Sequence, residues 1–145
     1  MTQTTDISLA IGLLSELVAA DQTIKGTLSR QLPKGMEMSH FSVLNHLSSS
    51  GEKSPAQLAR NFHLTKGAIT NTLKKLERAG YVHIRPDWDD ARRKMVSISP
   101  AGNQAREHAL AQLIPSFEKI IEVLGEQQIK QTLPTLRAFR GALGS

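Results

Sequence analysis

The sequence predicts a mainly α-helical protein that carries one small β-hairpin of two to three strands. Apolar residues recur at three- and four-residue steps over most of the chain, which is the spacing of one face of an α-helix. The pattern changes to alternation only around residues 81–85 and 94–99, which predicts two short strands. A length of 145 residues fits one domain, covering residues 1–145.

The first predicted helix covers residues 6–32. It carries a long apolar stripe, formed by Ile7, Ile11, Leu14, Val18, Leu28 and Leu32. The segment "PKG" at 33–35 ends this helix. A second helix follows and is closed by Gly51, and its apolar face contains Met38, Phe41, Leu44 and Leu47.

Two short helices come next. Ser54 can cap the first of them, Pro55 suits its first helical position, and Gln57 can complete a capping box. This helix ends near Phe62. Thr65 can cap the next helix, "KGAITNTLKKLERAG", and Gly80 provides its stop.

The predicted hairpin has a charged tip, "PDWDDARRK" at residues 86–94, between strands "YVHIR" and "KMVSIS". Ser99 and Pro100 begin a further helix by the same combination of cap and proline. Two long helices then fill residues 100–145. Pro115 and Pro134 lie inside them, and each is expected to kink or break its helix because proline lacks an amide donor.

Two short helices followed by a two-stranded hairpin make a winged helix-turn-helix, here over residues 36–99. The second short helix should bury a face of Ile69, Thr72, Leu73 and Leu76 and expose a face of Gly67, Asn71, Lys74 and Arg78. Residues 53–94 hold ten basic and four acidic side chains, a net charge of +6. This focus of charge favours a polyanionic partner, with nucleic acid first and an anionic membrane surface second.

The chain resembles the MarR-type transcriptional regulators. The similar segments are "FSVLNHL", "SPAQLARNFHLTKGAITNTLKKLERAGYV" and "DDARRKMVSISPAG". A cytoplasmic protein is the default expectation from the sequence. The resemblance implies a homodimer, with residues 6–32 and 100–145 forming the dimerisation helices. It also implies a ligand-responsive repressor that binds a pseudo-palindromic operator in double-stranded DNA.

The same resemblance, together with the exposed face of the second short helix, predicts the DNA-binding residues. They are Ser54, Thr65, Lys66, Gly67, Ala68, Thr70, Asn71, Lys74, Lys75, Asp90, Arg92, Arg93 and Lys94. Arg92 is expected to enter the minor groove, where negative potential is concentrated, with Asp90 orienting its guanidinium. Trp88 departs from the family pattern and is expected to pack on the hairpin or on a neighbouring subunit.

Relatives of this kind often bind a small hydrophobic or anionic effector, and here the expected pocket residues are Leu14, His40, Phe41 and Leu44. Cysteine oxidation as a trigger is excluded, because the chain has no cysteine. A metal site at His40, Glu107 and His108 is conceivable, but histidines that pack or face solvent are the stronger interpretation. We therefore predict no metal and no cofactor.

No glycine-rich phosphate loop or nucleophile elbow is present, so no enzyme activity is predicted. The competing interpretation is a winged helix that binds only proteins. No secretory signal is recognised, and no apolar run is expected to approach the roughly 20 residues that span a bilayer.

Overall fold

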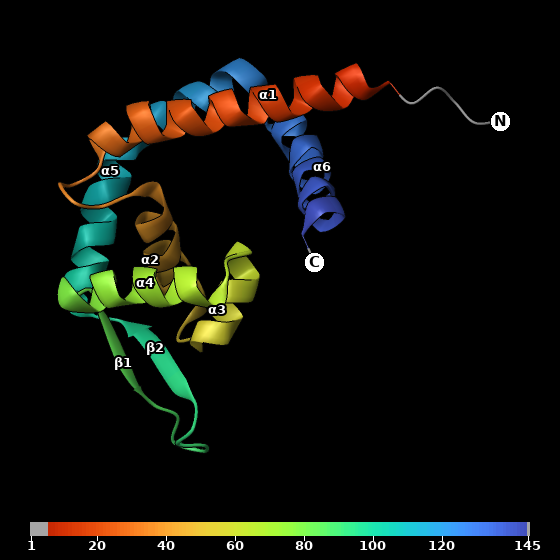
Figure 1. Ribbon diagram of the computed structural model, residues 1–145. Helices are drawn as coiled ribbons and strands as arrows, with labels where there is room; N and C mark the ends of the chain where they lie inside the picture. The colour runs from red at the N-terminus through yellow and green to blue at the C-terminus, as the bar shows by residue number, and fades with distance from the viewer. Residues whose placement is uncertain (1–5, 145) are drawn as a thin grey trace. The chain divides into compact units, whose positions relative to one another are not determined.

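The computed structural model describes residues 6–144, which form two compact units, one ending at Ala111 and one beginning at Gln112. The described residues contain six α-helices and one two-stranded antiparallel sheet (Figure 1). The predicted fold class, mainly α with a small β-hairpin, is confirmed.

Helix α1 spans Ile7–Thr23 and is capped by the Asp6 side chain, which accepts a hydrogen bond from the amide of Ser8. It continues into a π-helical turn, η1 (Ile24–Leu28), and a 3-10 turn, η2 (Ser29–Gln31). No residue of α1 is buried. This long segment therefore presents its apolar stripe to the outside.

The expectation that no apolar run approaches membrane-spanning length is wrong for this segment. Residues Ile7–Gln31 form 25 helical residues with an 18-residue window of mean hydropathy 1.4 and no part of that window buried. By length and composition the helix could cross a bilayer. A helix that packs against another protein chain has the same composition, because both must cover an exposed apolar stripe.

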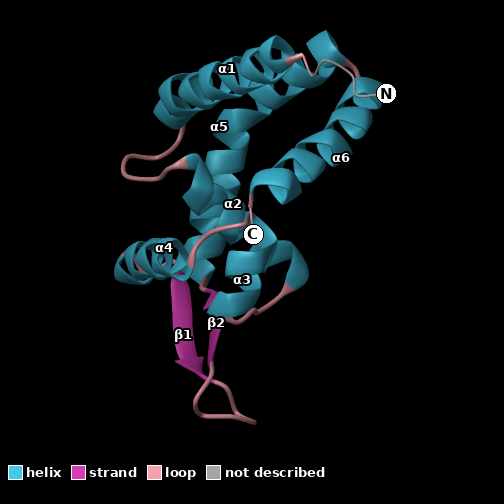
Figure 2. Cartoon of the chain, turned by 45° about the vertical axis from the view of Figure 1, so that its right-hand side comes forward, coloured by secondary structure: helices cyan, strands magenta, loops and turns pink. Residues whose placement is uncertain are grey.

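The winged helix-turn-helix is formed by α2 (Met38–Ser50), α3 (Pro55–Phe62) and α4 (Lys66–Arg78), followed by strands β1 (Val82–Pro86) and β2 (Lys94–Ile98). The strands pair in register from Val82 opposite Ile98 to Pro86 opposite Lys94. Figure 2 shows this hairpin extending away from α3 and α4. Lys53 adds a single bridge to Val96, so the sheet has two full strands and one bridging residue.

The predicted helix ends are confirmed by their hydrogen bonds. Ser54 and Gln57 form the reciprocal capping box of α3, and the Thr65 hydroxyl accepts from the amide of Ala68 at the start of α4. At the end of α4, Gly80 adopts a φ of 81°. Its amide donates to Glu77, and the amide of Tyr81 donates to Leu76, which is the bond pattern of a Schellman motif. This motif turns the chain directly into β1.

The core of the winged region lies where α2, α3, α4 and the hairpin meet. Its fully or almost fully buried side chains are Val43, Leu44, Leu47, Leu58, Ile69, Leu73, Leu76, Val82 and Val96. Burying an aliphatic side chain of this size stabilises a fold by about 1.5–3 kcal/mol. The core thereby fixes the inner face of α4 and leaves the opposite face free.

The start of α5 (Pro100–Leu124) is tied to the turn between α4 and β1. The buried Ser99 hydroxyl donates to Gly80 O at 2.6 Å and accepts from the amide of Gly102, while its own amide donates to Tyr81 O. A Cβ at Gly102 would collide with Tyr81 O, so only glycine fits there. These contacts hold the base of the wing.

Helices α5 and α6 (Glu126–Leu143) run through Pro115 and Pro134 without interruption, so of the expected kink or break, a break does not occur at either proline. A proline removes only one intrahelical donor, and the hydrogen bonds on either side keep the helix continuous. Because Pro115 has no amide N–H, it cannot donate a hydrogen bond to the carbonyl of Ala111, the residue at which the first compact unit ends. Gly125, with a φ of 83°, forms the turn between the two helices.

Candidate nucleic-acid interface

Helix α4 is set on the core by its apolar face. Ile69, Leu73 and Leu76 are 1–3% exposed, as predicted from their spacing. The turn before α4 is tight because His63 adopts the left-handed conformation, with a φ of 54°, and the amide of Leu64 donates back to Ala59. The orientation of α4 is therefore determined by packing on one side and by this turn at its beginning.

The outer face of α4 is exposed along its length. The exposed residues include Lys66, Gly67, Ala68, Thr70, Asn71, Lys74, Lys75, Glu77 and Arg78. No atom lies within 4 Å of the position that a Cβ would take at Gly67, so this glycine is not required by packing within the chain. Donors and cations on an open helix face can contact both base edges and phosphates in a major groove.

A groove of about 320 Å³ separates α4 from the wing. Thr70, Lys74 and Glu77 line it from α4, and Arg85 and Lys94 line it from the wing. Three cations and one carboxylate thus line this groove. An extended strand of phosphates would meet mostly positive charge there.

The tip of the wing carries a preformed Asp–Arg pair. The Asp90 carboxylate accepts from Arg92 Nε at 3.0 Å and from Arg92 Nη2 at 3.2 Å, and its Oδ1 also accepts from the Arg92 amide at 3.1 Å. These bonds to Arg92 hold the pKa of Asp90 below its usual value, so the carboxylate stays ionised near neutral pH. The Arg92 side chain is nevertheless 91% exposed. It is held in one orientation and remains available to a partner.

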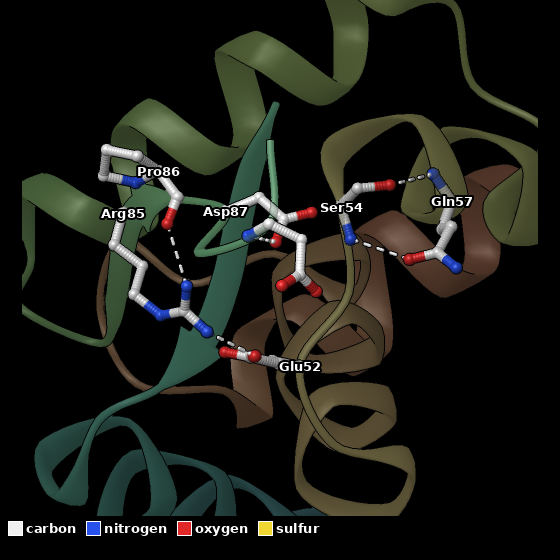
Figure 3. A network of polar contacts seen from close by, with 7 residues as sticks. Glu52, Ser54, Gln57, Arg85, Pro86 and Asp87 are labelled. Carbon is white, nitrogen blue, oxygen red and sulfur yellow. Dashed lines mark hydrogen bonds and ion pairs between the residues drawn. The ribbon is translucent and has the colours of Figure 1, made fainter. Parts of the chain in front are cut away.

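A second network fixes the base of the tip (Figure 3). Arg85 forms an ion pair with Glu52 and donates through Nη1 to Pro86 O at 2.8 Å. The Arg85 guanidinium carbon lies 4.6 Å from the centroid of the Trp88 ring, a cation–π contact. Trp88 is still 83% exposed. The packing expected for Trp88 on the hairpin is therefore limited to this contact.

Ser54, one of the residues expected at the DNA surface, is placed differently. Ser54 is 4% exposed and its hydroxyl is used in the capping box of α3, so it cannot offer that hydroxyl to DNA. Lys75 lies one helical step of about 100° from Lys74. It lines a different cavity, with Lys34 and His40.

The effector residues expected from the resemblance do not form one pocket. His40, Phe41 and Leu44 belong to the core with 0–5% exposure, and Leu14 lies on α1 at 44% exposure. Of these four, His40 borders a cavity of about 180 Å³ whose other lining residues include Lys34, Met36, Lys75, Leu76 and Tyr81. His40 Nδ1 accepts from the amide of Glu37 at 3.0 Å. Burial lowers the pKa of His40, the positive charge of Lys75 adds to this, and Glu37 opposes it.

Arg85 and Glu52 are site residues that the sequence did not indicate. They lie 33 positions apart, and no local pattern links them. Among residues 6–144, no group of three or more His, Asp or Glu side chains is arranged to hold a metal ion, so His40, Glu107 and His108 do not form a site there.

Comparison with known proteins finds a family match over the winged region and similar proteins over most of the chain. A family model of the MarR family matches residues 34–93. An uncharacterized HTH-type transcriptional regulator of Bacillus subtilis, YdgG, is 27% identical over 123 residues, which cover 83% of this chain and 81% of that protein.

Two solved structures are similar over most of their length. A probable transcriptional regulator from Pseudomonas aeruginosa is 27% identical with a TM-score of 0.73, covering 88% of this chain and 94% of that one. A mutant MarR from E. coli, complexed with operator DNA, has the same fold with a TM-score of 0.75 at 19% identity, covering 95% and 99% of the two chains. Residues 34–93 of this chain thus match the MarR family, and the chain as a whole is similar to winged helix-turn-helix transcriptional regulators.

Proposed function

We propose that this chain acts as a homodimeric repressor that binds a pseudo-palindromic operator. In this proposal α4 enters the major groove and the wing tip enters the adjacent minor groove of each half-site. The observation that carries the proposal is the exposed Arg92 held by Asp90 on the wing, beside the open basic face of α4. An arginine ordered before binding loses less side-chain entropy when it enters a groove.

The contacts divide into two classes. Thr70 and Asn71 carry hydrogen-bonding groups on the open face of α4 and would read base edges. Lys66, Lys74 and Arg93 would meet phosphates, which position the protein without reading sequence. Arg85 and Lys94 join this second class, because they line the groove between α4 and the wing where a phosphate strand would pass.

Dimer formation is supported by the apolar surface that the single chain leaves open. Ile7, Leu9, Ile11 and Val18 on α1 are 58–72% exposed, and Val123 and Leu124 near the end of α5 are 70% and 53% exposed. A monomer in water would expose these side chains at a cost of about 25 cal/mol per Å². A two-fold interface formed by the terminal helices would cover them and set two reading helices on one duplex. A DNA-bound protein of this kind would work in the cytoplasm.

The effector would be a small anion with an apolar portion. The cavity beside His40 combines two lysine ammonium groups with Met36, Leu76 and Tyr81, which suits a carboxylate attached to a small hydrophobic group. A ligand there would touch Lys75 and Leu76 of α4 and would therefore bias the position of the reading helix. Release from the operator on ligand binding would make the protein a ligand-responsive repressor.

Two measurements on the full chain test the proposal. Analytical ultracentrifugation at micromolar concentration should give a species of about twice 15.9 kDa. A footprint on fragments of the native genome should then protect two related half-sites about one helical turn apart. A monomer would contradict the dimer, and the absence of any protected DNA would favour the winged helix that binds only proteins.

A further inference from the structure

Trp88 is the only tryptophan of the chain, and it lies on the tip of the wing. Most of the larger exposed apolar side chains belong to the terminal helices, whose stripe a second subunit would cover. Trp88 is 83% exposed and lies among charged residues of the hairpin tip. The proposed dimer gives it no role.

The indole is held in place although it is exposed. One of its faces contacts the Arg85 guanidinium, with 4.6 Å between the guanidinium carbon and the ring centroid. Arg85 is itself anchored by Glu52 and by Pro86 O. The guanidinium therefore lies over one face of the ring, and the other face is free to meet a partner.

The tip also fixes where Trp88 lies relative to Arg92. The amide of Asp87 donates to Arg93 O, and the amide of Arg93 donates to Asp90 O, both at 2.9 Å. Asp87 and Arg93 thus face each other across the hairpin, and the next residues inward, Trp88 and Arg92, start from opposite sides of the same short loop. Trp88 and Arg92 are therefore presented by the same short loop at the tip of the wing.

The nearby charges favour DNA as the partner. Arg85 lies over the indole, and Arg92, Arg93 and Lys94 belong to the same hairpin. The carboxylates of Asp87 and Asp90 accept hydrogen bonds within the loop. The walls of a minor groove offer deoxyribose C–H groups next to phosphates. Such a wall can meet an apolar ring and its neighbouring cations together.

We propose that Trp88 is a second DNA contact of the wing, with its free indole face lying against the sugar–phosphate wall of the minor groove that Arg92 enters. The proposal rests on the proposed operator binding. It adds an apolar contact to a wing whose other contacts are ionic. Such a contact releases no counterions, so it should not depend on salt.

The single tryptophan makes the contact directly measurable in the full-length protein. The probe is an A·T-rich duplex of about three helical turns, labelled with fluorescein, and its anisotropy reports binding independently of Trp88. At saturation, acrylamide should quench the Trp88 emission much less than in the free protein. Heparin, a polyanion without grooves, should bind the basic face but leave Trp88 open to acrylamide.

Three variants separate an apolar contact from a structural effect. Trp88→Ala should weaken binding about tenfold while leaving the slope of log K against log salt unchanged. Trp88→Phe should keep most of the affinity, because a smaller ring can still contact the sugar wall. Arg93→Ala is the matched control on the same tip, and it should lower the salt slope by about one unit.

Each other result has a distinct meaning. DNA binding with unchanged acrylamide quenching, or wild-type affinity for Trp88→Ala, overturns the Trp88 contact and leaves operator binding intact. An indole already shielded from acrylamide in the free protein would mean that a second subunit covers it, which also overturns the proposal. No rise in anisotropy at low salt would contradict the proposed function itself.

Discussion

Removing the Asp90 carboxylate should weaken DNA binding, although it deletes a negative charge beside a polyanion. Asp90 holds the Arg92 guanidinium through two hydrogen bonds of 3.0 and 3.2 Å. In Asp90→Ala the Arg92 side chain regains its rotamer freedom, and that freedom must be lost again on binding. Ordering a free arginine side chain costs up to about 2 kcal/mol of entropy, which corresponds to a loss of up to about thirtyfold in affinity.

Simple electrostatics predicts the opposite sign. Within a Debye length of about 8–10 Å, deleting an acid near phosphates removes repulsion and should tighten binding. Asp89→Ala is the matched control, because Asp89 lies on the same tip and the pair with Arg92 is made by Asp90 instead. We expect Asp89→Ala to bind as tightly as the wild type or more tightly, and Asp90→Ala to bind more weakly.

The assay is a double-mutant cycle by fluorescence anisotropy at fixed salt, on operator DNA with an A·T-rich flank. Arg92→Ala should remove most of the contribution of the wing. In that background Asp90→Ala should have no further effect, because the two residues act as one unit. If Asp90→Ala remains folded and binds at least as tightly as the wild type, Asp90 does not position Arg92 for DNA.

The remaining predictions concern α4 and the core. Asn71→Ala should relax sequence preference by about 1–3 kcal/mol, whereas Lys74→Ala should weaken all sequences alike and lower the salt slope by about one unit. Equal specificity ratios and salt slopes for the two variants would contradict this division. Burial lowers the pKa of His40 in the folded protein, so the unfolded chain binds the proton first and stability should fall as the pH drops through 6.5. Urea midpoints at different pH should show this fall in the wild type, and a fall of equal size in His40→Gln would rule out His40 as its source.

Local signals predicted the winged region well. The capping box at Ser54, the cap at Thr65 and the stop at Gly80 each depend on a few neighbouring residues, and the structure confirms all three. The register of the hairpin also follows from its alternation, because a one-residue slip would bring polar residues to the face that carries the buried Val82 and Val96. The sequence therefore predicted best those features, such as helix caps and stops, whose residues all lie within one short segment.

The sequence was less informative where the position of a side chain depends on distant residues or where a residue has competing roles. Ser54 can cap a helix or contact a phosphate, and once its hydroxyl caps α3 it is buried. Lys74 and Lys75 are both exposed on α4, but Lys74 lines the groove beside the wing and Lys75 lines the cavity beside His40. The anchoring of Arg85 by Glu52 depends on tertiary structure that the hairpin sequence does not contain.

Gly67 offers a test that separates folding from DNA binding. Its backbone is helical and no atom lies within 4 Å of the position that a Cβ would take, so the free protein has no need for glycine there. Gly67→Ala should therefore raise the free energy of unfolding by up to about 1 kcal/mol. Gly102→Ala is the opposite case, because its Cβ would collide with Tyr81 O. It should lower the free energy of unfolding by about 1–3 kcal/mol.

The effect of Gly67→Ala on DNA binding should have the opposite sign to its effect on stability. If the first turn of α4 approaches the DNA backbone closely, the added methyl group lies between the helix and the DNA. Overpacking a tight contact costs about 1–3 kcal/mol, so Gly67→Ala should weaken DNA binding by about tenfold or more. Urea unfolding and anisotropy measured on the same preparation give both signs. If Gly67→Ala is more stable than the wild type and binds operator DNA equally tightly, α4 does not approach DNA closely at Gly67. Neither folding nor DNA recognition would then explain the glycine.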